Sequence, residues 1–154
     1  MSEAMPETDG LDRIDGGCHC GNIRFAFFRP PWGDTIPTRA CGCSFCVKHG
    51  GAYTSHPDGR IEIEIADHDR LERYRFGTGT ADFLICRTCG VVPLVTSVID
   101  GNCYAVVSVR AFEGIDPSVL DTAAADFDGE GTDDRLERRK RSWIGTVTGN
   151  LDRG

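Results

Sequence analysis

Seven of the eight cysteines in this 154-residue chain fall into three short groups, within which neighbouring cysteines are separated by one or two residues. The groups are Cys18 and Cys20, then Cys41, Cys43 and Cys46, then Cys86 and Cys89. Two thiolates at this spacing on a tight turn can both face one ion at about 2.3 Å, and Zn²⁺ prefers four such donors in a tetrahedron. Adjacent glycines let the backbone curl and leave amide N–H groups free to donate to sulfur. The spacing therefore predicts metal binding.

Disulfide pairing accounts poorly for the same groups. A disulfide between two cysteines one residue apart would close a very small, strained ring. Seven clustered thiols also leave one unpaired. An iron–sulfur cluster is the main alternative to zinc, because its ligands are thiolates as well.

The seven thiols divide naturally into a set of four and a set of three. The cysteine quartet joins two pairs that are far apart in the sequence: Cys18, Cys20, Cys86 and Cys89. The cysteine triad is local in the sequence: Cys41, Cys43 and Cys46. Four ligands make a closed structural site, which would tie the first strand to a late hairpin, whereas three leave a position for water or substrate. An alternative stays open for the triad, because His49 stands three residues after Cys46 and would close the site as a fourth ligand.

The remaining histidines and the eighth cysteine have simpler interpretations. His19 lies between two quartet cysteines and would project away from their ion, so we expect it at the surface. His56 and His68 are flanked by turn-forming or acidic residues, which is typical of loops. Cys103 stands alone inside a predicted strand and is interpreted as a small core hydrophobe.

Composition and charge exclude several classes of function. A length of 154 residues and a mass of 16.8 kDa suit one domain. The net charge of −7 makes nucleic acid a poor partner. The longest apolar run, 91–99, is too short to span a membrane. The first residues lack a secretory signal, so we expect a cytoplasmic protein, in which clustered cysteines are metal ligands or catalytic thiols.

Strand patterns dominate the middle of the chain. Ile23, Phe25 and Phe27 recur at every second position, and three isoleucines alternate with glutamates over 61–65. Further short strands are predicted over 71–76, 82–86, 93–98 and 103–109. Turn residues separate these runs, and no helical period persists among them. The predicted fold class is therefore mainly β.

The two ends of the chain differ from this middle. We expect a flexible tail over 1–15, a zinc-binding β domain over 16–112 and an extension over 113–154 that packs on the domain. Asp116 and Pro117 predict a short helical turn. A helix is predicted over 132–142, with acidic residues at its start and basic residues at its end, and with Leu136 as its main inward anchor. The basic run 135–141 is interpreted as a solvated face rather than an interaction patch, and Trp143 and Ile144 would dock on the sheet.

Three segments together resemble the glutathione-dependent formaldehyde-activating enzyme family. They are GCHCGNIRF over 17–25, ACGCSFC over 40–46 and FLICRTCG over 83–90. The order C-x-C, C-x-C-x-x-C and C-x-x-C-G matches the family in full, and the resemblance extends from about Gly16 to Phe112.

The resemblance implies an antiparallel β-tent zinc fold and a carbon–sulfur lyase that interconverts S-(hydroxymethyl)glutathione with glutathione and formaldehyde. It implies two zinc ions per chain. The structural zinc would be held by Cys18, Cys20, Cys86 and Cys89. The catalytic zinc would be held by Cys41, Cys43 and Cys46. The implied partners are a small glutathione-like thiol and an aldehyde.

Residues beyond the cysteines give little indication of the substrate. The segments 47–56 and 78–82 should line the active site, yet they contain no recognisable glutathione-binding signature. Local candidates for binding substrate carboxylates are Arg39, Lys48, Arg60 and Arg87. His49 or His56 would be available to move the hydroxyl proton. Two non-enzymatic alternatives stay open: a zinc-stabilised binding module with two closed sites, and a redox sensor whose triad releases zinc on oxidation.

Overall fold

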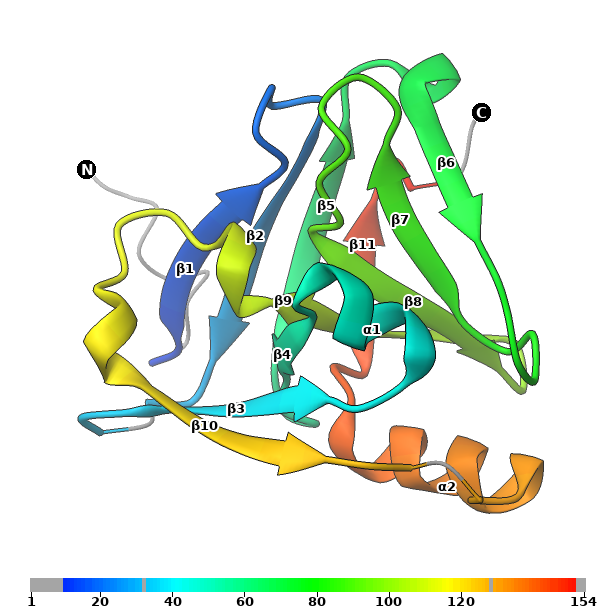
Figure 1. Cartoon of the computed structure of the whole chain (residues 1–154). Coiled ribbons are helices and arrows are strands. Elements are labelled where there is room, and N and C mark those ends of the chain that lie inside the picture. The colour runs from blue at the N-terminus through cyan, green and yellow to red at the C-terminus, as the bar shows by residue number, and fades with distance from the viewer. Residues whose placement is uncertain (1–9, 32, 128, 152–154) are drawn as a thin grey trace.

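Two β-sheets form the framework of the residues that the computed structural model describes, which are 10–31, 33–127 and 129–151 (Figure 1). The four-stranded sheet contains, in spatial order, β1 (Asp12–Gly17), β2 (Ile23–Arg29), β5 (Arg60–Ile65) and β11 (Thr146–Gly149). The seven-stranded sheet contains, in spatial order, β10 (Leu120–Ala125), β3 (Ile36–Cys41), β4 (Ala52–Thr54), β9 (Asn102–Ser108), β8 (Leu94–Ile99), β7 (Asp82–Cys86) and β6 (Leu71–Tyr74).

Helices are few and short in the described residues. They are α1 (Ser44–His49), α2 (Thr132–Ser142) and the 3₁₀ turns η2 (His68–Arg70), η3 (Val109–Ala111) and η4 (Pro117–Val119). The helix predicted over 132–142 is confirmed as α2, with Asp133 and Asp134 in its first turn and basic residues in its last. The predicted turn is confirmed as η4, where the Asp116 carboxylate accepts a hydrogen bond from the Ser118 amide at 2.9 Å. The mainly β fold class is also confirmed.

Most neighbouring strands are antiparallel, as expected, but two pairs are parallel. β10 pairs with β3, and β11 pairs with β5. β10 and β11 both come from the C-terminal part of the chain, and each pairs with a strand that lies much earlier in the sequence. The expected tail differs as well, because residues 12–15 belong to β1, whereas 1–9 lie outside the described residues.

The apolar faces of the two sheets meet in a shared core. In β5, Ile61, Ile63 and Ile65 are at most 2% exposed, whereas Glu62 and Glu64 face solvent, as their alternation predicts. The seven-stranded sheet contributes Leu84, Leu94 and Val107 to the same cluster. Burial of these side chains supplies the main driving force for folding, and it fixes the loops between the strands in place.

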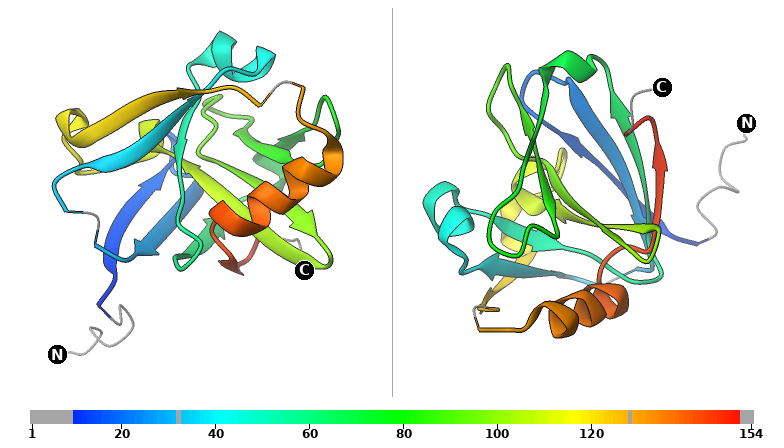
Figure 2. Two further views of the ribbon diagram at one scale, coloured as in Figure 1. Left: turned by 90° about the horizontal axis from the view of Figure 1, so that it is seen from below. Right: turned by 90° about the vertical axis from the view of Figure 1, so that its right-hand side faces the viewer.

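Helix α2 lies across the strands β8 and β9 and leads directly into the sheet framework (Figure 2). Trp143 and Ile144, which follow the helix, are both buried, as expected. The expected anchor Leu136 is only half-buried, and the buried residue of the helix is Arg139. An arginine can be buried at this position because its guanidinium donates hydrogen bonds to polar side chains, as described below. No helix in the described part of the chain is long and apolar enough to cross a membrane.

Candidate metal centres

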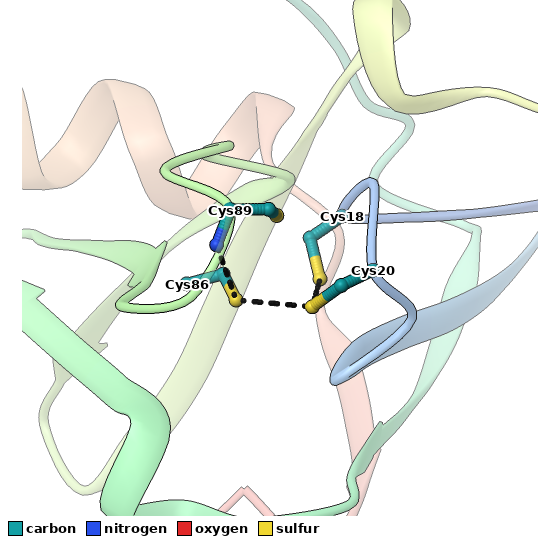
Figure 3. A group of neighbouring side chains, drawn as sticks. All are labelled: Cys18, Cys20, Cys86 and Cys89. Atoms are coloured by element: carbon teal, nitrogen blue, oxygen red, sulfur yellow. Dashed lines mark hydrogen bonds between the residues drawn. The ribbon is translucent and has the colours of Figure 1, made fainter.

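The four thiols of the cysteine quartet converge from two hairpins that belong to different sheets (Figure 3). Their Sγ atoms all lie within 4.8 Å of one another. The distance is 3.8 Å between the sulfurs of Cys18 and Cys20, and 3.5 Å between those of Cys20 and Cys86. Four sulfurs placed tetrahedrally at about 2.3 Å from Zn²⁺ lie about 3.8 Å apart, so this donor set fits a zinc ion.

Backbone amides at both turns donate to these sulfurs. The Ile23 N–H donates to Cys18 Sγ at 3.2 Å, and the Cys89 N–H donates to Cys86 Sγ at 3.5 Å. Gly90 ends the second turn with a φ of +80°, which glycine adopts without steric cost. Such amide donors orient thiolate ligands and stabilise their charge.

The protonation of the quartet is uneven. Burial raises the pKa of Cys18 to about 11. The pKa of Cys89 is lowered to about 6, because hydrogen bonds from the backbone amides of Val91 and Cys20 outweigh the opposing effect of burial. A metal ion that binds here therefore displaces protons from the thiols.

Helix α1 positions the cysteine triad. Cys41 ends β3, Cys43 is the N-cap of α1 and Cys46 lies in its first turn. The Cys43 sulfur accepts a hydrogen bond from the Cys46 amide at 3.3 Å, which is the usual role of an N-cap side chain. The three Sγ atoms all lie within 4.8 Å of one another. Three thiols at this separation form a donor set that suits a zinc ion with one position open.

Tyr53 closes the inner side of the triad. Its hydroxyl lies 3.1 Å from Cys46 Sγ, and the residue is 6% exposed. Burial raises the pKa of Tyr53 far above its usual range, so the hydroxyl stays neutral and can donate to sulfur. Gly51 makes this approach possible, because a Cβ there would lie 2.8 Å from Cys46 Sγ and 2.6 Å from the Tyr53 oxygen.

One thiol of the triad ionises easily without a metal. A hydrogen bond between the Cys41 and Cys46 side chains lowers the pKa of Cys41 to about 5 and raises the pKa of Cys46. Burial opposes the ionisation of Cys41 but does not cancel this effect. Cys41 is thus the thiol of this pair whose ionised form the hydrogen bond favours.

No histidine of the described residues belongs to either group of sulfur donors. The His49 ring packs at a tilt against the Phe45 ring, with 4.3 Å between centroids, and among the described residues it is not part of the triad's group of donor atoms within 4.8 Å. His19 is exposed, as predicted, and the Nδ1 atom of His56 accepts a hydrogen bond from the Asp58 amide. His68 contacts the Asn150 carbonyl at 2.7 Å. Cys103 is half-buried rather than a core residue, because it is the second residue of β9 and lies near the end of that strand.

The triad opens into a cavity of about 210 Å³ that lies between the seven-stranded sheet, α1 and α2. All three triad cysteines and Tyr53 line it. Its apolar walls are formed largely by aromatic and β-branched side chains: Phe76, Phe83, Val95, Val106, Phe127 and Trp143. We define this space as the triad cavity. A thiol that entered it would meet the three sulfurs in a mostly apolar surrounding.

Four arginines also line the triad cavity: Arg39, Arg135, Arg138 and Arg139. Arg39 was a candidate from the sequence, but the other three come from the basic run of α2, which was expected to be a solvated face. That interpretation is wrong for Arg139, which is 6% exposed. Its Nη1 donates to Thr80 Oγ1 at 2.8 Å and to Ser97 Oγ at 3.2 Å. These two hydroxyls explain why a guanidinium can be buried there.

The other sequence candidates for binding substrate lie away from this cavity. The Arg60 guanidinium lies over the Phe28 ring at 4.1 Å, and Arg87 forms an ion pair with Glu72 at 2.6 Å. Lys48 is exposed, and neither His49 nor His56 is among the described lining residues.

A larger depression of about 900 Å³ lies over β1, β2 and β5 near the exposed Cys20. It is open and mostly polar, and its lining includes both arginines and glutamates, such as Arg24 and Glu62. Its size exceeds that of the triad cavity, but the four quartet sulfurs already form a complete donor set for one tetrahedral ion. The three-sulfur set therefore marks the triad cavity as the better candidate for chemistry.

Comparison with known proteins points to one family. Residues 13–124 match the family model described as "Glutathione-dependent formaldehyde-activating enzyme". This match includes all seven clustered cysteines and ends before α2 begins.

A solved structure of a protein from Rhodobacter sphaeroides is similar to this chain. The two are 28% identical, with a TM-score of 0.52, and the similarity covers 71% of this chain and 99% of the other. The similarity therefore includes nearly all of the bacterial protein, whereas part of this chain has no counterpart in it.

Proposed function

The chain belongs to the glutathione-dependent formaldehyde-activating enzyme family, and on that premise we propose that it is a zinc-dependent carbon–sulfur lyase. It would form or cleave an S-hydroxymethyl thiol adduct, with a glutathione-like thiol and an aldehyde as substrates. One observation carries the proposal: a set of three thiols, rather than four, opens into a cavity that a small substrate can enter.

The two cysteine groups have different roles in this proposal. The quartet holds a structural zinc ion, because its four sulfurs satisfy a tetrahedral ion without an outside ligand. The triad holds the catalytic zinc through Cys41, Cys43 and Cys46. When bound there, zinc supplies Lewis-acid chemistry that lowers the pKa of a substrate thiol.

The chain's own residues position the reactants. The apolar walls of the triad cavity exclude water around the aldehyde carbon. In the forming direction, the substrate sulfur bonds to the carbonyl carbon, the C=O π bond breaks, and the thiol's proton ends on the new hydroxyl. Tyr53 keeps the Cys46 sulfur in place through its neutral hydroxyl, so the open side of the triad faces the cavity.

The test is adduct exchange between formaldehyde and either glutathione or the smaller thiol 3-mercaptopropionate, followed by exchange NMR on zinc-loaded protein. Replacing Cys43 by serine should lower the catalysed exchange rate by about 100-fold, because it removes a ligand of the catalytic metal. The matched control is Cys103→Ser, which changes a cysteine outside both groups and should leave the rate unchanged. Equal rates for the wild type and Cys43→Ser, including no catalysis by either, would exclude the lyase proposal.

The binding-module alternative is less well supported. It required a fourth ligand at the triad and no cavity beside it. In the described residues His49 packs against Phe45 instead, and the cavity is lined by all three triad cysteines.

A further inference from the structure

The positive charge of the triad cavity exceeds the negative charge that faces it. Its described lining contains four arginines and neither aspartate nor glutamate. Glu130 lies 3.1 Å from Arg138 and 3.9 Å from Arg135. Arg39 and Arg139 form no ion pair with the described residues of the chain. Among the described ion pairs, Glu130 therefore serves two of the four guanidinium groups.

The guanidinium groups also keep unused donors. Arg139 is 6% exposed, yet its Nε atom has no hydrogen-bond partner among the described residues, and neither does the buried Nε of Arg135. Burial, together with the nearby charges of Arg135 and Arg138, lowers the pKa of Arg139 to about 10. Buried charges and donors without partners are costly, so an anion that entered the cavity would be stabilised by them.

The size of the triad cavity limits what this anion can be. A volume of about 210 Å³ lies below the range of roughly 300–1,000 Å³ that is usual for small-molecule sites. The same walls hold the triad sulfurs and the arginines, so one compact molecule can reach both. Such a molecule carries its thiol and its negative charge a few bonds apart.

We propose that α2 provides a carboxylate-binding subsite in the triad cavity, with Arg135 and Arg139 as its principal donors, and that the site selects a compact thiol acid. The proposal rests on the proposed function, because it places the thiol of this acid at the triad. Planar guanidinium groups suit a carboxylate, which can accept two hydrogen bonds side by side. Since the family match ends before α2, this selectivity is a property of this chain's own C-terminal segment.

Calorimetric titration of the zinc-loaded protein tests the proposal without any need for turnover. The probes are 3-mercaptopropionate and its neutral isostere 3-mercaptopropionamide. We expect the acid to bind at least about tenfold more tightly, because charge-assisted hydrogen bonds are stronger than neutral ones. Arg135→Gln should reduce this preference to less than about threefold.

The control variant is Arg141→Gln, which removes the same charge from an exposed position of α2 outside the cavity lining and should keep the full preference. Equal affinities of the wild type for acid and amide would overturn the inference, as would equal losses in the two variants. Tighter binding of glutathione than of 3-mercaptopropionate would also overturn it, because a whole tripeptide would then fit. A preference that persists in a protein without lyase turnover would support the subsite and exclude only the proposed function.

Discussion

The two cysteine groups place the same side chain in different structural settings. The quartet joins a turn of the four-stranded sheet to a loop of the seven-stranded sheet, so its partners are far apart in the sequence. The triad lies where β3 leads into α1, and it faces a cavity whose lining includes four arginines. Both groups consist of cysteines, so the type of ligand does not distinguish them. They differ in whether their ligands come from distant segments or from one local segment of the chain. A metal that links two sheets stabilises the fold, whereas one held by a single local segment can be exposed to substrate.

The largest expected effect is on thermal stability, and it tests whether the quartet supports the fold more than the triad does. Cys86→Ser removes a ligand that connects the two sheets, and structural zinc contributes on the order of 10 kcal/mol to the folding of small zinc domains. We therefore expect Cys86→Ser to lower the melting temperature by more than about 10 °C, with a few degrees at most for Cys43→Ser. Thermal unfolding followed by circular dichroism measures both. Similar losses in the two variants would show that the triad is as structural as the quartet.

A second, intermediate effect concerns the tyrosine hydroxyl beside the triad. Tyr53→Phe removes the hydroxyl that lies 3.1 Å from Cys46 Sγ and leaves the ring in place. Groups that support metal ligands typically contribute about 10–100-fold in metal affinity. The zinc ion of the triad, which we call the second equivalent, should therefore be lost at a lower chelator concentration than in the wild type. Metal analysis during chelator titration measures this. If the zinc ion of the quartet were released more easily instead, Tyr53 would be acting on the whole fold.

The smallest expected effect sharpens the electrostatic side of the comparison. Glu130→Gln removes the carboxylate that pairs with Arg135 and Arg138, so the triad cavity becomes more positive. We expect 3-mercaptopropionate to bind about two- to fivefold more tightly, at a cost of about 1 kcal/mol or less in stability. Titration calorimetry and urea unfolding measure the two changes. Weaker binding would show that Glu130 orders the arginines rather than competing for them.

Much of the fold follows from local sequence patterns. The alternation in β5 and the charge distribution of α2 predict both elements, because amphipathic strands and dipole-matched helices are visible within a few residues. The two cysteine sets were also predicted from spacing alone. Helix α1 was not, because its six residues are too few to show a helical period.

Contacts between distant segments explain what the sequence could not reveal. A basic run is usually a solvated face, and the burial of Arg139 depends on Thr80 and Ser97, which are 59 and 42 residues away. The contact between Tyr53 and Cys46 likewise requires Gly51 and the turn after α1. One local feature does hint at the cavity: Arg138 and Arg139 stand three and four residues after Arg135, which places all three on one side of a helix. The parallel pairs of β10 and β11 leave no comparable local pattern.

The path of the C-terminal segment has a consequence for how this chain can diversify. From β10 the chain joins one sheet, crosses the triad cavity as α2, and ends in the other sheet as β11. Substitutions along the crossing helix can therefore alter which molecule is accepted while every sulfur donor is retained. Under the proposed function, the sulfur donors and three of the four cavity arginines would lie on separate stretches of the chain, so substrate preference would be able to change while the metal ligands stay the same.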